Sequence, residues 1–176
     1  MSTETANVES TQAALFRSRE AVSSALNLYN ATSKGLRDTI VSVRARGVVT
    51  VKQMAEALGT DRNYVDQVWS THGRKDDGSW VTRGDVHELV DDLKSLANAN
   101  ASFRAASNAL NTARAERNRV ISLAYASKVL GPSEIANAVG IDRNHVQRIA
   151  RKAGIKPLHR SNPRNQYTVN KTSDQD

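Results

Sequence analysis

The chain has 176 residues and a formal net charge of +7, with 39% hydrophobic and only 5% aromatic residues. A core of Ala, Val, Leu and Ile, interrupted by few glycines and prolines, favours an all-α fold over a β-sandwich, which needs more aromatic and β-branched residues. The lack of cysteine excludes disulfides and thiolate metal sites, and no segment reaches the roughly 20 apolar residues of a membrane span, so we expect a soluble cytoplasmic protein.

The first half of the chain is expected to form one helical domain over residues 11–71. Residues 1–10 are polar and acidic, unlike a secretory signal, and we expect them to be disordered. Apolar residues at helical spacing predict a helix over residues 11–31 and another over residues 34–46, which Gly47 ends. Two shorter helices are predicted near residues 51–58 and 62–71.

The second half is expected to form another helical domain over residues 85–154. Glycines and an Asp-Gly pair in residues 72–84 indicate a linker or a small hairpin wing, with Trp80 beside its turn. Apolar residues then predict a long helix over residues 85–114. The shorter helices of this half are predicted over residues 117–129, 132–139 and 143–153. Residues 155–176 are polar and basic with two prolines, and we expect a disordered arm.

An internal repeat relates the two halves at a constant offset of 81 residues. The segment from Val51 to Val65 matches the segment from Pro132 to Val146, and the tripeptide Asp-Arg-Asn stands at the same place in both copies. Upstream apolar residues follow the same register more loosely. Such self-similarity indicates a duplicated structural unit, supporting helices included.

Each copy has the residue types that two helices joined by a sharp turn require. In the first copy Ala55 allows a close helix crossing, Gly59 can adopt a positive φ, and Asp61 suits the N-cap of the next helix. The second copy has the same types at Ala136, Gly140 and Asp142. The apolar positions that fix the angle between the helices are Met54, Leu58, Val65 and Val68 in the first copy and Ile135, Val139, Ile141, Val146 and Ile149 in the second.

These features resemble the helix-turn-helix family of DNA-binding proteins, over residues 51–71 and again over residues 132–153. The first copy departs from the family pattern at Thr60, where the family usually has an apolar residue, so we expect its turn to pack less tightly. The resemblance implies two helix-turn-helix domains in tandem, joined by a short linker and a long helix. It also implies double-stranded DNA as the partner, read in the major groove by the second helix of each motif.

The resemblance assigns DNA contacts to the side chains that point away from the predicted core of each recognition helix. Arginine can bond two acceptors of guanine, while Asn and Gln pair with adenine. In the second copy the side chains assigned to DNA contact are Arg143, Asn144, Gln147, Arg148, Arg151 and Lys152. In the first copy they are Arg62, Asn63, Asp66, Gln67 and Ser70. Asp66 repels phosphate but can accept a hydrogen bond from a cytosine amino group.

The distribution of charge favours the second copy as the stronger DNA-binding module. Residues 116–176 hold 11 basic and 5 acidic side chains, whereas residues 1–81 hold 10 and 9. Basic side chains bind a polyanion through counterion release, although a charge excess also serves solubility. The arm carries Lys156, Arg160 and Arg164, which we expect to follow the DNA backbone or enter the minor groove, with a solvated tail as the alternative.

The supporting helices and the remaining polar residues are interpreted as structural. The apolar stripes favour a core role, but Leu89, Leu93, Leu96 and Phe103 also have a spacing that suits a homodimer. Trp69 is expected to anchor its helix to the core, and the pair Asp91-Asp92 to lie on a solvated face. The four histidines are scattered, and no phosphate loop, His pair or nucleophile motif occurs. We therefore expect no enzyme activity, no metal and no cofactor.

The sequence thus predicts a sequence-specific transcription regulator, with a repressor as the leading expectation, associated with the nucleoid of a bacterium or phage-infected cell. Two reading heads in a monomer would recognise an asymmetric site, and a dimer would recognise a palindrome. A different class is an architectural DNA-binding protein for segregation or packaging, like partition adaptors or small terminase subunits. A third is a helical interaction protein with a degenerate first module, which the near-neutral charge of that module leaves open.

Overall fold

The computed structural model describes residues 3–73 and 86–156, and all the regular secondary structure in these ranges is helical. The prediction of an all-α fold is therefore confirmed. The predicted wing, with Trp80, and most of the predicted arm lie outside the described residues. None of the described helices is both long and apolar enough to cross a bilayer.

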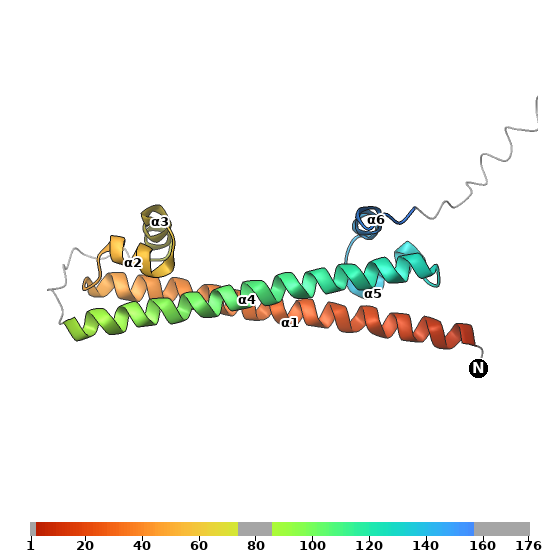
Figure 1. The fold of residues 1–176 in the computed structure, drawn as a ribbon, viewed down its shortest axis with the longest axis horizontal. Helices are drawn as coiled ribbons and strands as arrows, with labels where there is room; N and C mark the ends of the chain where they lie inside the picture. Colours follow the sequence, from red (N-terminus) through yellow and green to blue (C-terminus); the bar gives the residue numbers. More distant parts are fainter. Residues whose placement is uncertain (1–2, 74–85, 157–176) are drawn as a thin grey trace, which may run out of the picture. The chain divides into compact units, whose positions relative to one another are not determined.

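Helix α1 runs without interruption over Thr3–Arg46, so the predicted division into two helices is wrong (Figure 1). The predicted break lay at the polar residues Thr32 and Ser33. The Thr32 hydroxyl donates to the carbonyl of Leu28 at 2.9 Å, one turn back, so it does not compete with the helical hydrogen bonds. As predicted, Gly47 ends the helix: it adopts a φ of +70° directly after Arg46.

The expectation of a disordered N-terminus over residues 1–10 is also wrong for the residues that the structure describes. Helix α1 already begins at Thr3, and Val8 packs against a buried cluster that includes Leu15. A helix end is ordered when its apolar face has a surface to cover, and here that surface belongs to residues more than 100 positions further along the chain.

Helix α4 is likewise one continuous helix over Val86–Ser127, where two helices were predicted with a break between residues 114 and 117. The residues at that point are Ala115 and Glu116, both good helix formers, and no glycine or proline occurs within the helix. The helix ends at Ser127, before Lys128, which has a φ of +59°.

The four short helices follow the sequence-based expectation closely. They are α2 at Val51–Leu58, α3 at Arg62–His72, α5 at Pro132–Val139 and α6 at Arg143–Lys152. We call α2 with α3 the first helix pair and α5 with α6 the second helix pair. The helices within each pair pack against one another.

The chain forms two compact units, and their limits differ from the predicted domains at 11–71 and 85–154. Unit 1 comprises residues 1–19 and 117–176, while unit 2 comprises residues 20–116. Each long helix therefore contributes to both units, because α1 passes from one to the other after Arg19 and α4 passes back after Glu116. The physical reason lies in the packing of the apolar faces: each helix pair covers parts of both long helices.

The core of unit 2 joins the first helix pair to the C-terminal part of α1 and the N-terminal part of α4. Its buried side chains are Leu36, Ile40, Val43, Val49, Met54, Ala55, Leu58, Val65, Val68 and Leu96. Leu89, Leu93 and Phe103 of α4 pack against this cluster, and the Phe103 ring lies 5.4 Å from the ring of Tyr29 between centroids. The apolar stripe of α4 thus has partners within its own chain, as its core interpretation predicted.

The expectation that Asp91 and Asp92 both lie on a solvated face is wrong for Asp92, which belongs to unit 2. Asp91 is exposed, but Asp92 retains only 5% exposure and accepts hydrogen bonds from the guanidinium of Arg46 at the end of α1. A carboxylate so far removed from water requires an ionic partner, and Arg46 supplies it.

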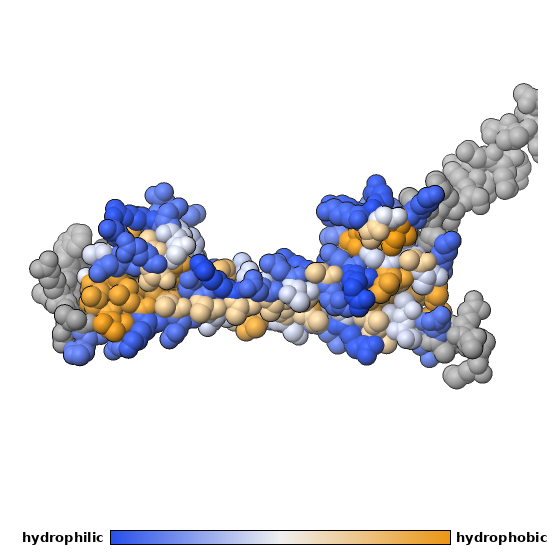
Figure 2. All heavy atoms as spheres, viewed as in Figure 1, coloured by the Kyte–Doolittle hydropathy of each residue, from blue (hydrophilic) through white to orange (hydrophobic). Residues whose placement is uncertain are grey.

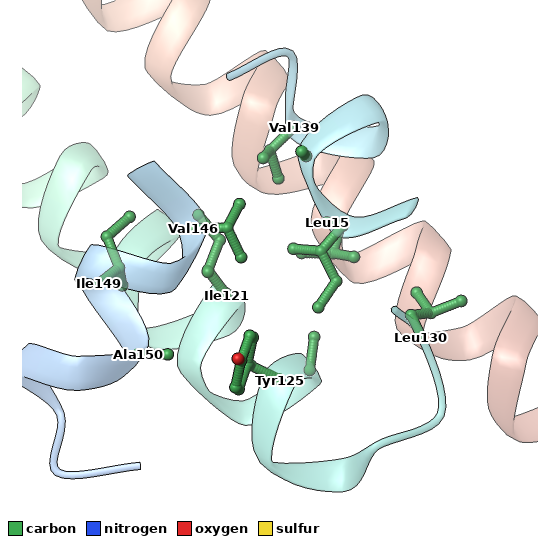
Figure 3. Close-up of a cluster of buried hydrophobic side chains, with 11 residues drawn as sticks. Leu15, Ile121, Tyr125, Leu130, Val139, Val146, Ile149 and Ala150 are labelled. Atoms are coloured by element: carbon green, nitrogen blue, oxygen red, sulfur yellow. The ribbon is translucent and has the colours of Figure 1, made fainter. Parts of the chain in front are cut away.

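The core of unit 1 joins the second helix pair to the C-terminal part of α4 and to the N-terminal part of α1 (Figure 3). Leu15 from α1 projects toward Ile121 of α4 and Val139 and Val146 of the second helix pair. The remaining buried members are Ala124, Tyr125, Leu130, Ile135, Ala136, Ile149 and Ala150. This cluster fixes the orientation of α6 and thereby decides which of its side chains face solvent.

Candidate nucleic-acid interface

The turn of the second helix pair is built by the residues that the sequence singled out. Gly140 ends α5 with a φ of +68°, and its neighbour Ile141 is half-buried against the core of unit 1. The carboxylate of Asp142 accepts a hydrogen bond of 2.7 Å from the backbone N–H of Asn144, which caps α6. The start of α6 is thereby held at a fixed angle to α5.

The turn of the first helix pair repeats this construction. Gly59 has a φ of +61°, and the carboxylate of Asp61 accepts from the backbone N–H of Tyr64 at 2.9 Å. Thr60 is exposed where its counterpart Ile141 is half-buried, so this turn makes fewer apolar contacts, as expected. Polar contacts from α4 reinforce it instead, because Asn100 and Arg104 both donate to the carbonyl of Leu58, at 2.9 and 3.3 Å.

Helix α6 presents four cations to solvent. It contains no acidic residue, while α3 carries one cation and one carboxylate, Arg62 and Asp66. The predicted contact residues of α6 that are exposed are Arg143, Asn144, Arg148, Arg151 and Lys152, and Gln147 is half-buried. Figure 2 shows hydrophilic residues along the outer edge of this helix and hydrophobic residues directly beneath them, toward the long helices. Four cations of the basic last third of the chain therefore lie together on α6.

A shallow hollow of about 350 Å³ lies along α6, from its N-cap to its last turn. Its lining comprises Asp142, Asn144, His145, Arg148 and Arg151. The hollow brings together three of the predicted contact residues and adds His145, which the sequence alone assigns to the general surface. The helical period could have found His145, since it lies one turn from Arg148.

Burial and surrounding cations hold the pKa of His145 below its ordinary value. The largest cause is desolvation, followed by repulsion from Arg148, Arg117 and Lys152, while Asp142 acts in the opposite direction. A neutral imidazole at physiological pH avoids adding another charge to a surface already rich in cations.

A second hollow, of about 250 Å³, lies where α6 meets the supporting helix α4. It is lined by Asn118, Arg119, Ser122, Ile149, Lys152 and Ala153. The α4 residues in this set were missed, because the sequence gives no direct sign of which side of a supporting helix lies beside the end of α6. Three polar side chains of α4 thus share this hollow with Lys152 of α6.

Helix α3 exposes Arg62, Asn63 and Gln67, as predicted, but a contact from α1 changes the character of its surface. The guanidinium of Arg44 donates to the Asp66 carboxylate at 2.5 Å and lies over the Trp69 ring at 5.1 Å from its centroid. Trp69 is half-buried against this cation and is not a member of the buried core, which corrects the expectation of a core anchor. Sequence reasoning missed Arg44 because it precedes the repeated segment.

The basic arm is represented in the structure by Lys156 alone, which is exposed beyond Gly154. Arg160 and Arg164 lie outside the described residues. Within residues 3–73 and 86–156, no cluster of three or more His, Asp or Glu side chains has the arrangement needed to hold a metal ion.

Comparison with known protein families, curated proteins and solved structures finds no match to this chain.

Proposed function

We propose that the chain is a sequence-specific double-stranded DNA-binding protein whose second helix pair is a helix-turn-helix module, with α6 in the major groove. The observation that carries the proposal is the surface of α6: four cations and no acid, on a helix whose opposite face is fixed in the core of unit 1 by Val146, Ile149 and Ala150. A positively charged helix held rigidly by its apolar face suits a groove lined by phosphates.

Within this proposal the residues of α6 divide between base readout and phosphate contact. Arg143 and Asn144 stand in the first turn, where a recognition helix reaches base edges, and Gln147 follows one turn later. Arg151 and Lys152 stand in the last turn and would meet the DNA backbone. The long arginines suit guanine, and the amides suit adenine.

The first helix pair supports a second, weaker reading head. It has the same turn, the same Asp cap and exposed Arg62, Asn63 and Gln67, but a net charge near zero on α3. Counterion release therefore contributes little to its affinity, and specificity must come from base contacts. A chain with two different reading helices would recognise an asymmetric DNA site. A protein bound at such a site would exclude polymerase and thereby act as a repressor.

Selection of bound duplexes from a random DNA pool, at near-physiological salt, tests this proposal with the full-length protein. A recovered motif in which Arg143→Ala relaxes one base position supports α6 as a reading helix, with a loss of roughly 5- to 150-fold for the preferred base. Arg114→Ala, which removes an exposed arginine from the middle of α4, serves as the matched control and should leave the motif unchanged.

Salt-sensitive binding without any enriched motif would contradict sequence-specific regulation and favour an architectural role in DNA packaging or segregation. Absence of binding to any duplex at low salt would overturn the proposal as a whole, since counterion release would then supply no affinity.

A further inference from the structure

The internal repeat allows the two reading helices to be compared position by position. At the offset of 81 residues, Arg44 corresponds to Tyr125, Asp66 to Gln147 and Trp69 to Ala150. In unit 1, Tyr125 and Ala150 are both buried in the apolar core. In unit 2 the same two places hold a cation and an aromatic ring, stacked at 5.1 Å from the guanidinium carbon to the ring centroid.

The presence of Arg44 and Trp69, where unit 1 has two buried apolar-core residues, places a positive charge beneath α3. The negative charge of Asp66 compensates it. The Arg44 side chain is only 25% exposed, whereas the Asp66 side chain is 54% exposed. The carboxylate therefore lies on the solvent side of the pair, at the place where the other module has Gln147. Arg44 bonds the Oδ1 atom of Asp66 at 2.5 Å, and the structure gives Oδ2 no hydrogen-bond partner within the described residues.

We infer that Arg44 is a positioning residue that makes Asp66 a specificity determinant for cytosine in the first module. This inference rests on the proposed DNA-binding function. A carboxylate accepts from the amino group of cytosine, which is the hydrogen-bond donor that a G·C pair presents in the major groove. Arg44 offsets the charge that would otherwise repel phosphates and fixes the carboxylate in one orientation.

The stacking on Trp69 explains why Arg44 acts through Asp66 and does not itself read a base. A guanidinium over an indole face gains cation–π stabilisation, and one donor of the Arg44 guanidinium bonds Asp66. Exposure of 25% leaves little of the side chain accessible to a base edge. The triad of Arg44, Asp66 and Trp69 therefore holds a single acceptor on the surface of α3.

The test is duplex selection with the wild type, Asp66→Asn and Arg44→Met, each checked for helicity by circular dichroism. We expect one position of the motif to require cytosine in the wild type, by roughly 5- to 150-fold over other bases. Asp66→Asn should remove that preference while leaving the other positions unchanged. Arg44→Met should reduce the preference for cytosine at the same position and weaken binding. Arg44→Lys keeps the charge without the planar guanidinium, so it should retain more of the affinity than of the preference for cytosine.

The control is Asp38→Asn, which removes another ion-paired carboxylate, held by Lys34 at 2.6 Å on α1. It should not alter the motif. An unchanged cytosine preference in Asp66→Asn, or a wild-type motif in which only the second module is represented, would overturn this inference and leave the proposed function standing. Failure of the wild type to bind any duplex would instead overturn the proposed function.

Discussion

The guanidinium of Arg46 contacts both carboxylate oxygens of Asp92, joining the last residue of α1 to the second turn of α4 within unit 2. The Nε–Oδ2 distance is 3.2 Å, and Asp92 is 5% exposed, while the Arg46 side chain is 48% exposed. The pair is therefore asymmetric: the carboxylate depends on its partner, and the guanidinium retains contact with water.

Replacing Arg46 with Met should destabilise unit 2 by about 2 kcal/mol, because it leaves the Asp92 carboxylate buried without its cation. The double variant Arg46→Met with Asp92→Leu should recover much of this loss, because no buried charge then remains. Urea unfolding followed by circular dichroism measures both effects. As a control, Lys34→Met breaks an ion pair whose members are 73% and 60% exposed, and the expected change is below about 1 kcal/mol. Equal losses of unfolding free energy in Arg46→Met and Lys34→Met would contradict this account.

Protonation of His145 should oppose folding. Its pKa in the folded protein lies below the ordinary value of 6.5, so the unfolded chain binds more protons than the folded chain between these two values. The free energy of unfolding should therefore fall as the pH is lowered from about 7 through 6.5 toward the folded pKa, and level off below it. His145→Gln should remove this component. The measurement is the difference in unfolding free energy between wild type and variant across that range, and a difference independent of pH would refute the lowered pKa.

Sequence reasoning located the local structure of the helix pairs well, since caps and turns depend on a few neighbouring residues. Asp61, Asp142, Gly59 and Gly140 each have the conformation or hydrogen bond expected of their type. The division of the chain into units was not predicted, because it depends on which distant surface an apolar stripe covers. Leu15 has the spacing of a core residue in any arrangement, and nothing in the first half indicates that it packs on Ile121.

The candidate interface also contains residues that could be predicted from the sequence and one that could not. The residues of α6 could be predicted because its apolar face follows the helical period, which leaves Arg143 and Arg148 outside. Arg44 could not be predicted, because an arginine near a helix end is ordinarily solvated, and its stacking on Trp69 arises only when α3 packs against α1.

Alanine at Gly140 should destabilise unit 1 by about 1–2 kcal/mol, because a Cβ is disfavoured at positive φ. A Cβ there would also lie 3.3 Å from the Arg19 guanidinium, so that side chain would have to shift. Gly35→Ala is the matched control with the opposite expected sign. Gly35 lies inside α1, where an added Cβ would meet no atom within 4 Å, and alanine should stabilise the helix by about 0.5–1 kcal/mol. Thermal unfolding distinguishes them, and a stabilised Gly140→Ala would contradict the left-handed turn.

Lys152 provides a contrast with Arg143 in DNA binding, under the proposed function. Lys152 lines the hollow between α6 and α4 together with Asn118 and Ser122, and its flexible ammonium, a point charge in the last turn of α6, suits a backbone phosphate. Lys152→Ala should weaken binding to all duplexes alike and reduce the slope of log affinity against log salt by about 0.9. Titrations of one specific and one unrelated duplex at several salt concentrations measure this slope. Lys34→Ala, remote in sequence from both helix pairs, controls for the loss of one charge. A selective loss for the specific duplex would assign Lys152 to base readout and contradict this prediction.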